Sequence, residues 1–115
     1  MSSHNFINYK EFENVDIRIG TVIEAYEYNE LKKPSIILKI DFGEKIGVKK
    51  TSAQLQKYYK SDELINKQVI AVINFEPKQI GKIISEVLVL GLPDQENEPI
   101  LLSPNIKMNN GIKLY

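Results

Sequence analysis

Hydrophobic and polar residues alternate along two stretches in the first half of the chain, with the period of a half-buried β-strand. In residues 15–25, "VDIRIGTVIEA", one face holds Val15, Ile17, Ile19, Ile23 and Ala25. In residues 35–43, "SIILKIDFG", one face holds Ile36, Leu38, Ile40 and Phe42. Gly20 in the middle of the first stretch predicts a bend or bulge. Gly43 ends the second stretch, and "KIGVKK" after it predicts a hairpin into a third strand.

A short helix is predicted at residues 7–12, "INYKEF". Asn8 is a suitable N-cap, and Glu11 lies three positions later, where it completes a capping box. Ile7 and Phe12 have the spacing of a hydrophobic staple. Because so short a helix is unstable alone, we expect its apolar face to pack on the body of the domain or on a second subunit.

The period changes at residues 51–59, "TSAQLQKYY", which predicts a second short helix. Thr51 or Ser52 can cap it. Leu55, Tyr58 and Tyr59 recur at three- and four-residue spacing. We expect Leu55 and Tyr58 to pack against one end of the folded body.

The second half of the chain holds two runs that are apolar on both faces, as in strands covered on both sides. They are "QVIAVINF" at residues 68–75 and "SEVLVLGL" at residues 85–92. An extended piece, "EPILLSP", follows at residues 98–104. The tail ends in Ile112, Leu114 and Tyr115, apolar side chains that we expect to be covered.

The order of elements is therefore a helix, three strands, a helix, two strands and an extended tail. This order predicts an all-β fold: a five-stranded OB-fold Greek-key barrel with a short N-terminal helix and a helix between strands 3 and 4. An SH3-like barrel is the alternative, but it usually lacks the mid-chain helix. At 115 residues the chain is long enough for one domain, residues 1–115. Residues 1–13 and 104–115 are terminal extensions of it.

Charge is distributed unevenly along a chain whose net charge is zero. Residues 1–44 hold 5 basic and 8 acidic side chains, a net charge of −3. Residues 45–82 hold 8 and 3, a net charge of +5, and residues 83–115 hold 2 and 4, a net charge of −2. The middle segment is either an ordinary solvated surface or a basic stripe that attracts an anionic partner. Since dedicated nucleic-acid binders usually have a basic isoelectric point, we expect only modest affinity for a polyanion.

Catalytic and metal-binding patterns are missing from the sequence. There is no cysteine, and His4 is the only histidine, so neither a thiolate nor a histidine-based zinc site is expected. The glycines show no phosphate-loop or dinucleotide-binding spacing. No apolar run approaches the roughly 20 residues of a membrane span, and no signal peptide is recognisable. We predict a cytoplasmic protein that is not an enzyme, needs no cofactor and does not insert into a membrane.

The candidate site is the connection after residue 73, where no acidic residue occurs from Pro77 to Ser85. Aliphatic side chains beside amides suit an extended peptide, and we predict a peptide-binding set of Asn74, Phe75, Gln79, Ile80, Ile83 and Ile84. Lysines suit phosphates, and we predict an RNA-binding set of Lys49, Lys50, Asn74, Lys78, Lys82 and Ser85. Lys49 and Thr51 share one face of the third strand, which we expect to be its outer surface. The alternative is that the lysines only aid solubility and the apolar residues pack under the loop or at a subunit interface.

Several stretches resemble a known family. "VDIRIGTVIEA" resembles the opening strand of the tRNA-binding domain of Trbp-type proteins, some methionyl-tRNA synthetases and the EMAP II cytokine. "NFEPKQIG" followed by "SEVLVLG" is similar to that family's Asn-Leu-x-Pro-x-x-x-x-Gly…Ser element. "KIDFGEKIGVKKTSAQL", "FEPKQIGKIISEVLVLGLPD" and "ILLSP" are most similar to its CsaA branch of export-related chaperones, from about Asn8 to Tyr115.

The resemblance implies a stand-alone tRNA-binding-type OB fold that forms homodimers through its terminal extensions. It implies an ATP-independent chaperone that binds unfolded or pre-secretory polypeptides in support of protein export. The alternative is a small dimeric tRNA-binding protein that recognises tRNA by shape. The synthetase-appended domains carry a Lys/Arg-Met-Arg-Gly run and then Ser-Gln-Gly-Met, whereas this chain has "KQIG" at residues 78–81 and "SEVL" at residues 85–88. The departure places an anion beside the serine, which disfavours tight tRNA binding and favours the CsaA branch.

Overall fold

The computed structural model describes residues 5–30 and 32–115. His4 and the rest of residues 1–4 of the predicted N-terminal extension lie outside the described residues. The helices are α1 (Tyr9–Glu13) and α2 (Ser61–Leu64). The strands are β1 (Ile17–Tyr28), β2 (Ser35–Asp41), β3 (Val48–Ala53), β4 (Gln68–Val72), β5 (Lys78–Ile80), β6 (Ile83–Ser85), β7 (Leu88–Val89), β8 (Gly91–Pro93) and β9 (Pro99–Leu101).

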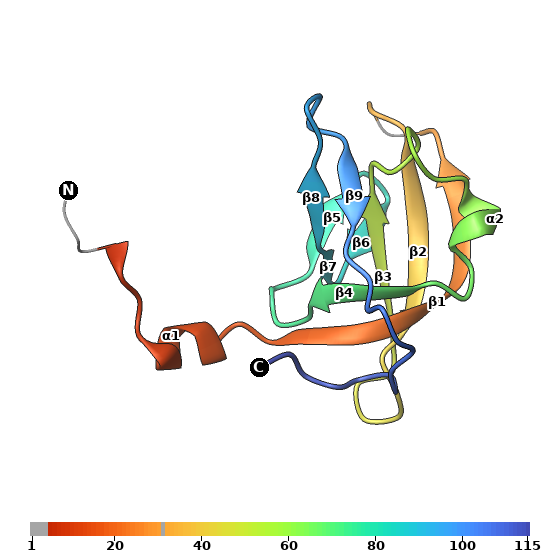
Figure 1. Ribbon diagram of the computed structural model, residues 1–115. Helices are drawn as coiled ribbons and strands as arrows, with labels where there is room; N and C mark the ends of the chain where they lie inside the picture. The colour runs from red at the N-terminus through yellow and green to blue at the C-terminus, as the bar shows by residue number, and fades with distance from the viewer. Residues whose placement is uncertain (1–4, 31) are drawn as a thin grey trace.

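The central sheet is antiparallel and has the strand order β3-β2-β1-β4-β7. The long strand β1 pairs with β4 through residues 17–21 and with β2 through residues 21–28. Because one strand serves two neighbours in succession, the sheet curls around it, as Figure 1 shows. The hairpins β5–β6 and β8–β9 stand beside this sheet. The arrangement confirms the predicted all-β, OB-like fold.

The core lies inside the curl of the sheet. Its buried residues are Val22, Ile36, Leu38, Ile40, Phe42, Leu55, Leu64, Val69, Ala71 and Val87. The prediction that Ile36, Leu38, Ile40 and Phe42 point inward is therefore confirmed. Ile37, on the opposite face of β2, is also fully buried, which a strictly alternating pattern does not predict.

Strand β1 departs from the predicted alternation after Gly20. Val22 is fully buried and the side chain of Ile23 is 46% exposed, because the register with β2 shifts between Val22 and Glu24. The predicted inward position of Ile23 is therefore wrong. Gly20 itself is required by packing, since a Cβ there would lie 2.6 Å from Ile40 Cγ2; the bulge comes two residues later.

Helix α1 begins as the sequence predicts. Asn8 Oδ1 accepts a hydrogen bond from the Glu11 backbone N–H (2.8 Å), and Glu11 Oε1 accepts one from the Asn8 backbone N–H (3.0 Å). The capping box is confirmed.

The helix predicted at residues 51–59 is wrong. Residues 51–53 stay in β3, where they pair with residues 36–38 of β2, and α2 begins only at Ser61. Between them the Tyr59 N–H donates to the Leu55 carbonyl (3.1 Å), which closes a single turn. Leu55 is buried as expected, but Tyr58 is 47% exposed, and Leu64 of α2 joins the core instead.

The C-terminal tail pairs with the first half of β1. The Gly111 N–H donates to the Ile19 carbonyl (2.8 Å), the Ile19 N–H to the Ile112 carbonyl (3.2 Å), and the Leu114 N–H to the Ile17 carbonyl (2.8 Å). These bonds bring the end of the chain close to α1, as Figure 1 shows. Helix α1 and the C-terminal end of the chain therefore lie on one side of the molecule.

The hairpin β8–β9 is attached to the turn that precedes α2. The Tyr58 hydroxyl donates to Asp94 Oδ2, and Lys57 Nζ forms an ion pair with Glu96. The Leu101 N–H donates to the Tyr59 hydroxyl (2.9 Å). Side chains rather than a shared ladder hold this hairpin in place.

Candidate ligand-binding site

A cavity of about 530 Å³, here called the hairpin cavity, opens between β3 and the β5–β6 hairpin. Its walls include Phe75, Lys78, Ile80, Ser85, Glu86 and Leu88. Phe75 is 57% exposed and Leu88 is 49% exposed, so both leave carbon in contact with solvent. Covering such side chains with an apolar group lowers the free energy of the system.

The β5–β6 hairpin divides the predicted peptide-binding set between its two faces. In its register Lys78 is opposite Ser85, and Ile80 is opposite Ile83; Lys78, Ile80 and Ser85 line the hairpin cavity. Ile83 is only 7% exposed, so it packs beneath the hairpin.

The other face of the hairpin carries Gln79 opposite Ile84. Successive strand residues point to opposite faces, so these two side chains point away from the hairpin cavity. Gln79 Nε2 donates to the Gly81 carbonyl (3.0 Å), and Ile84 is 53% exposed. Of the predicted peptide-binding set, the structure therefore brings only Phe75 and Ile80 together in the cavity wall.

Asn74 has a structural role that the sequence does not reveal. Its Oδ1 accepts a hydrogen bond from the Asp16 N–H (3.0 Å), and its Nδ2 donates to the Asn14 carbonyl (2.8 Å). Both ends of the amide therefore hold the segment that leads from α1 into β1. The contacts span 58 and 60 residues of sequence, so no local pattern announces them.

The floor of the hairpin cavity is a seam between β3 and the end of β6. The Glu86 N–H donates to the Lys50 carbonyl (2.8 Å), and the Lys50 N–H donates to Glu86 Oε1 (2.9 Å). The Ser52 N–H donates to Ser85 Oγ (3.2 Å). Side chains thus replace a regular ladder here, and β7 then pairs with β4. For this reason the single strand predicted at residues 85–92 is divided among β6, β7 and β8.

The side chain of Thr51 faces the core, not the outer surface. It is 2% exposed, and its hydroxyl donates to the Val87 carbonyl (2.8 Å). Lys49 lies on the same face of β3, opposite Ile40, and Lys50 lies on the other. The expectation that Lys49 and Thr51 share the outer surface is wrong, because Leu38 and Ile40, their partners on β2, are core residues.

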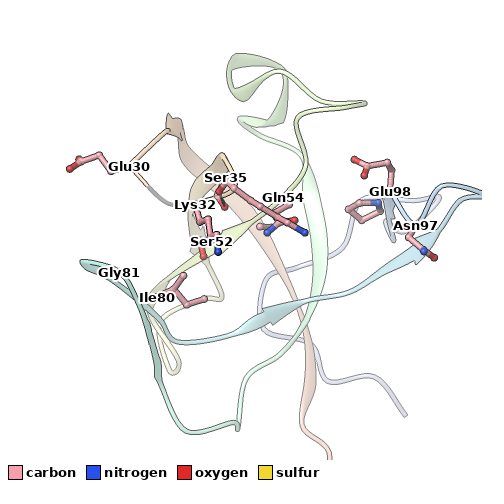
Figure 2. A pocket seen from close by; sticks show the side chains of 12 residues that line it. Glu30, Lys32, Ser35, Ser52, Gln54, Ile80, Gly81, Asn97 and Glu98 are labelled. Atoms are coloured by element: carbon pink, nitrogen blue, oxygen red, sulfur yellow. Dashed lines mark hydrogen bonds between the residues drawn. The ribbon is translucent and has the colours of Figure 1, made fainter.

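A second, more open cavity of about 920 Å³, here called the loop cavity, adjoins the first. The two share Ser52 and Ile80. Figure 2 shows Lys32 and Gln54 near this shared wall, with Asn97 and Glu98 on the far side. The loop cavity thus extends the hairpin cavity, and most of the residues that line it are of polar types.

Lys32 and Lys33 line the loop cavity but belong to neither predicted set. They come from the β1–β2 connection, far in sequence from the basic segment 45–82. Gly81 lines the same cavity and precedes Lys82, so the fold brings lysines from both segments to one region. In the part of the chain that the structure describes, Lys32, Lys33, Lys78 and Lys82 form no ion pair.

The side of the molecule that holds α1 and the C-terminal end also carries exposed hydrophobic side chains. The most exposed hydrophobic side chains there are Phe6 (86%), Ile7 (67%), Tyr9 (65%) and Tyr115 (98%).

Two further kinds of site are a metal centre and a membrane span. Within residues 5–30 and 32–115, no group of three or more histidine, cysteine, aspartate or glutamate residues is placed to hold a metal ion. Neither α1 nor α2 is long and apolar enough to span a bilayer.

Solved structures with similar sequences have the same fold as this chain. Residues 17–113 match the model of the family described as "Putative tRNA binding domain". The crystal structure of the chaperone CsaA from Bacillus anthracis str. Ames superposes with a TM-score of 0.88 at 44% identity, covering 96% of this chain and 99% of that one. The chain belongs to the tRNA-binding domain family and is of the CsaA type.

Two further relatives define the range of the family. The CsaA chaperone protein from Picrophilus torridus has a TM-score of 0.88 at 47% identity, over 96% of this chain and all of that one (100%). A methionine–tRNA ligase from Pyrococcus horikoshii is 35% identical over 109 residues, which is 95% of this chain. The match spans only 14% of the length of that ligase, so it concerns a binding domain and not a catalytic one.

Proposed function

We propose that the chain is an ATP-independent chaperone without enzymatic activity, which binds unfolded or pre-secretory polypeptides as a cytoplasmic homodimer in support of protein export. The observation that carries the proposal is the hairpin cavity, where Phe75 and Leu88 are half-exposed in a concave wall. Two solved structures named as CsaA chaperones are 44% and 47% identical in sequence to this chain. A cavity with exposed carbon in its wall suits capture of apolar chain segments.

An extended client segment has two ways to bind here. Its apolar side chains enter the hairpin cavity and cover Phe75 and Ile80. Its main chain pairs with β5, which within the described residues pairs with β6 alone. Addition of a strand to a free edge relies on backbone groups, so it accepts clients of different sequence.

The test is suppression of aggregation of thermally denatured citrate synthase, followed by turbidity. We expect Phe75→Ser combined with Ile80→Ser to abolish protection, because both side chains line the cavity. Ile84→Ser is the matched control, since Ile84 lies on the opposite face of the same hairpin. Full protection by the double variant would contradict the proposed site. Loss of protection with Ile84→Ser would extend the client site to Gln79 and Ile84.

The homodimer is proposed from the exposed side chains at the two ends of the chain. Extensions 1–13 and 104–115 form the interface, and a two-fold partner places each copy's apolar surface against the other. We expect Phe6→Ser with Tyr115→Ser to give monomers in light scattering at micromolar concentration. Leu92→Ser is the control, because Leu92 is 61% exposed on β8. A wild-type monomer, or a double variant that remains dimeric, would contradict this interface.

A small dimeric tRNA-binding protein that recognises tRNA by shape is the second candidate. Family membership and the unpaired lysines around the two cavities favour it. Of the predicted contacts, Lys50, Lys78 and Lys82 would bind phosphates, with Ser85 as a hydrogen-bonding group. Lys49 lies on the core-facing side of β3, and both ends of the Asn74 amide hold the segment between α1 and β1. Affinity for tRNA would then fall steeply with salt, by about 0.7–0.9 in the log–log slope for each phosphate contact. Client binding in the same preparation would change little with salt.

A further inference from the structure

Glu86 is held in the wall of the hairpin cavity by two hydrogen bonds to one residue. Its N–H and its Oε1 bind the carbonyl and the N–H of Lys50, at 2.8 and 2.9 Å. Glu86 is half-buried, and its carboxylate cannot turn away without losing the hydrogen bond from the Lys50 N–H. Its position in the cavity is therefore determined by the fold.

The charge of Glu86 is not neutralised by a neighbour. Within the described residues Glu86 forms no ion pair, and the hydrogen bond from Lys50 reaches only Oε1. Lys78 and Ser85 line the same cavity, and the Lys50 backbone is bonded to Glu86; all three residues belong to the predicted RNA-binding set. A fixed negative charge thus lies among the groups that would contact phosphates.

Glu76 also lines the hairpin cavity but differs in one respect. Its side chain is exposed and accepts no hydrogen bond from the part of the chain that the structure describes. It is free to turn toward solvent, where water and salt screen its charge. Of the two glutamates that line the hairpin cavity, Glu86 is the one whose carboxylate is held by a hydrogen bond.

We infer that Glu86 is a specificity-determining residue, which excludes RNA from the hairpin cavity while it admits polypeptide. A phosphate within a few ångströms of this carboxylate is repelled, whereas the N–H groups of a polypeptide are attracted to its second oxygen. Discrimination by repulsion of the wrong ligand is a common source of specificity. The inference rests on the proposed function and names the feature that separates its two candidate ligands.

The test compares Glu86→Gln with Glu44→Gln, which removes the same charge in the β2–β3 turn, away from both cavities. Glutamine retains an oxygen for the Lys50 N–H, so the seam is preserved. Binding of unfractionated tRNA is measured by titration at about 0.1 M salt, where screening acts over roughly 10 Å. We expect Glu86→Gln to bind tRNA roughly three- to tenfold more tightly than wild type, and Glu44→Gln to bind as wild type does. The gain should shrink as salt is raised.

A second variant separates charge from loosening of the seam. Glu86→Ala removes both the charge and the acceptor, so equal gains in Glu86→Gln and Glu86→Ala support the inference. A gain in Glu86→Ala alone would overturn it, as would equal tRNA affinity in wild type, Glu86→Gln and Glu44→Gln, or no binding by any of them. Wild-type protection of citrate synthase is measured separately. Its absence would contradict the chaperone proposal and leave the effect of Glu86 on RNA to be judged by the titration.

Discussion

Strand β2 and residues 74–91 are both rich in isoleucine and leucine, yet they differ in what those side chains do. In β2, residues Ile36, Ile37, Leu38 and Ile40 are all fully buried. In residues 74–91, Phe75, Ile84 and Leu88 are about half-exposed. The apolar side chains are of the same kinds in both segments, so their chemistry alone does not explain the difference.

The pairing of the strands explains this difference in burial. β2 is bonded to β1 along one edge and to β3 along the other, so its register is determined on both sides. β5 and β6 are three-residue strands that pair with each other. The end of β6 is attached to β3 by one backbone hydrogen bond, from the Glu86 N–H to the Lys50 carbonyl, and by the side chains of Ser85 and Glu86. Within the described residues β5 keeps one edge unpaired, which leaves this region accessible to a ligand, whereas β2 is held on both edges and supplies stability.

Truncating one leucine in each segment should give the largest contrast. Leu38→Ala leaves a cavity in the core and should lower the free energy of unfolding by about 2–5 kcal/mol. Leu88→Ala removes a side chain that is 49% exposed and should cost about 1 kcal/mol or less. Urea denaturation measures both. Similar losses in the two variants would show that Leu88 contributes to the core as Leu38 does.

A smaller effect is expected at two glycines. In Gly20→Ala the new Cβ would lie 2.6 Å from Ile40 Cγ2 and 2.8 Å from Phe42 Cδ1, and overpacking of this kind costs about 1–3 kcal/mol. Gly81, in the β5–β6 turn, has a φ of 62°, and alanine there costs roughly 1 kcal/mol from backbone strain alone. Thermal melts rank the two variants. If Gly20→Ala leaves the melting temperature unchanged, the sheet must relax around this position in β1.

The same difference in pairing decides what the sequence could predict. The inward residues of β2 were predictable because a strand paired on both sides keeps a strict period of two. The capping box at Asn8 and Glu11 was predictable because its contacts lie three residues apart. Ile23 was mispredicted because a bulge reverses the period after Val22, and its cause, the switch of partner from β4 to β2, is not local.

The helix prediction for residues 51–59 was wrong for a different reason. Thr51 and Ser52 are suitable both as N-caps and as strand residues, and pairing with β2 decided between them. In the candidate site, Phe75 and Ile80 could be named because their exposure follows from a polar, turn-rich neighbourhood. Lys32 and Lys33 could not, because only the tertiary fold brings the β1–β2 connection beside Gly81.

The β8–β9 hairpin provides the smallest and most specific test of how side chains hold a short hairpin. The hydrogen bond from the Tyr58 hydroxyl, with further bonds from the backbone N–H groups of Glu98 and Glu96, lowers the pKa of Asp94 below its ordinary value. A carboxyl group whose pKa is lowered in the folded state stabilises the fold above its unfolded pKa, near 4, and this contribution is lost as the pH falls through the folded pKa. We therefore expect wild type to lose more stability than Asp94→Asn between about pH 5 and pH 2. Tyr58→Phe should lose part of the same pH dependence, because it removes the hydroxyl donor. Melting temperatures across that range measure the effect, and identical pH profiles for wild type and Asp94→Asn would show that the hairpin is held without this carboxylate.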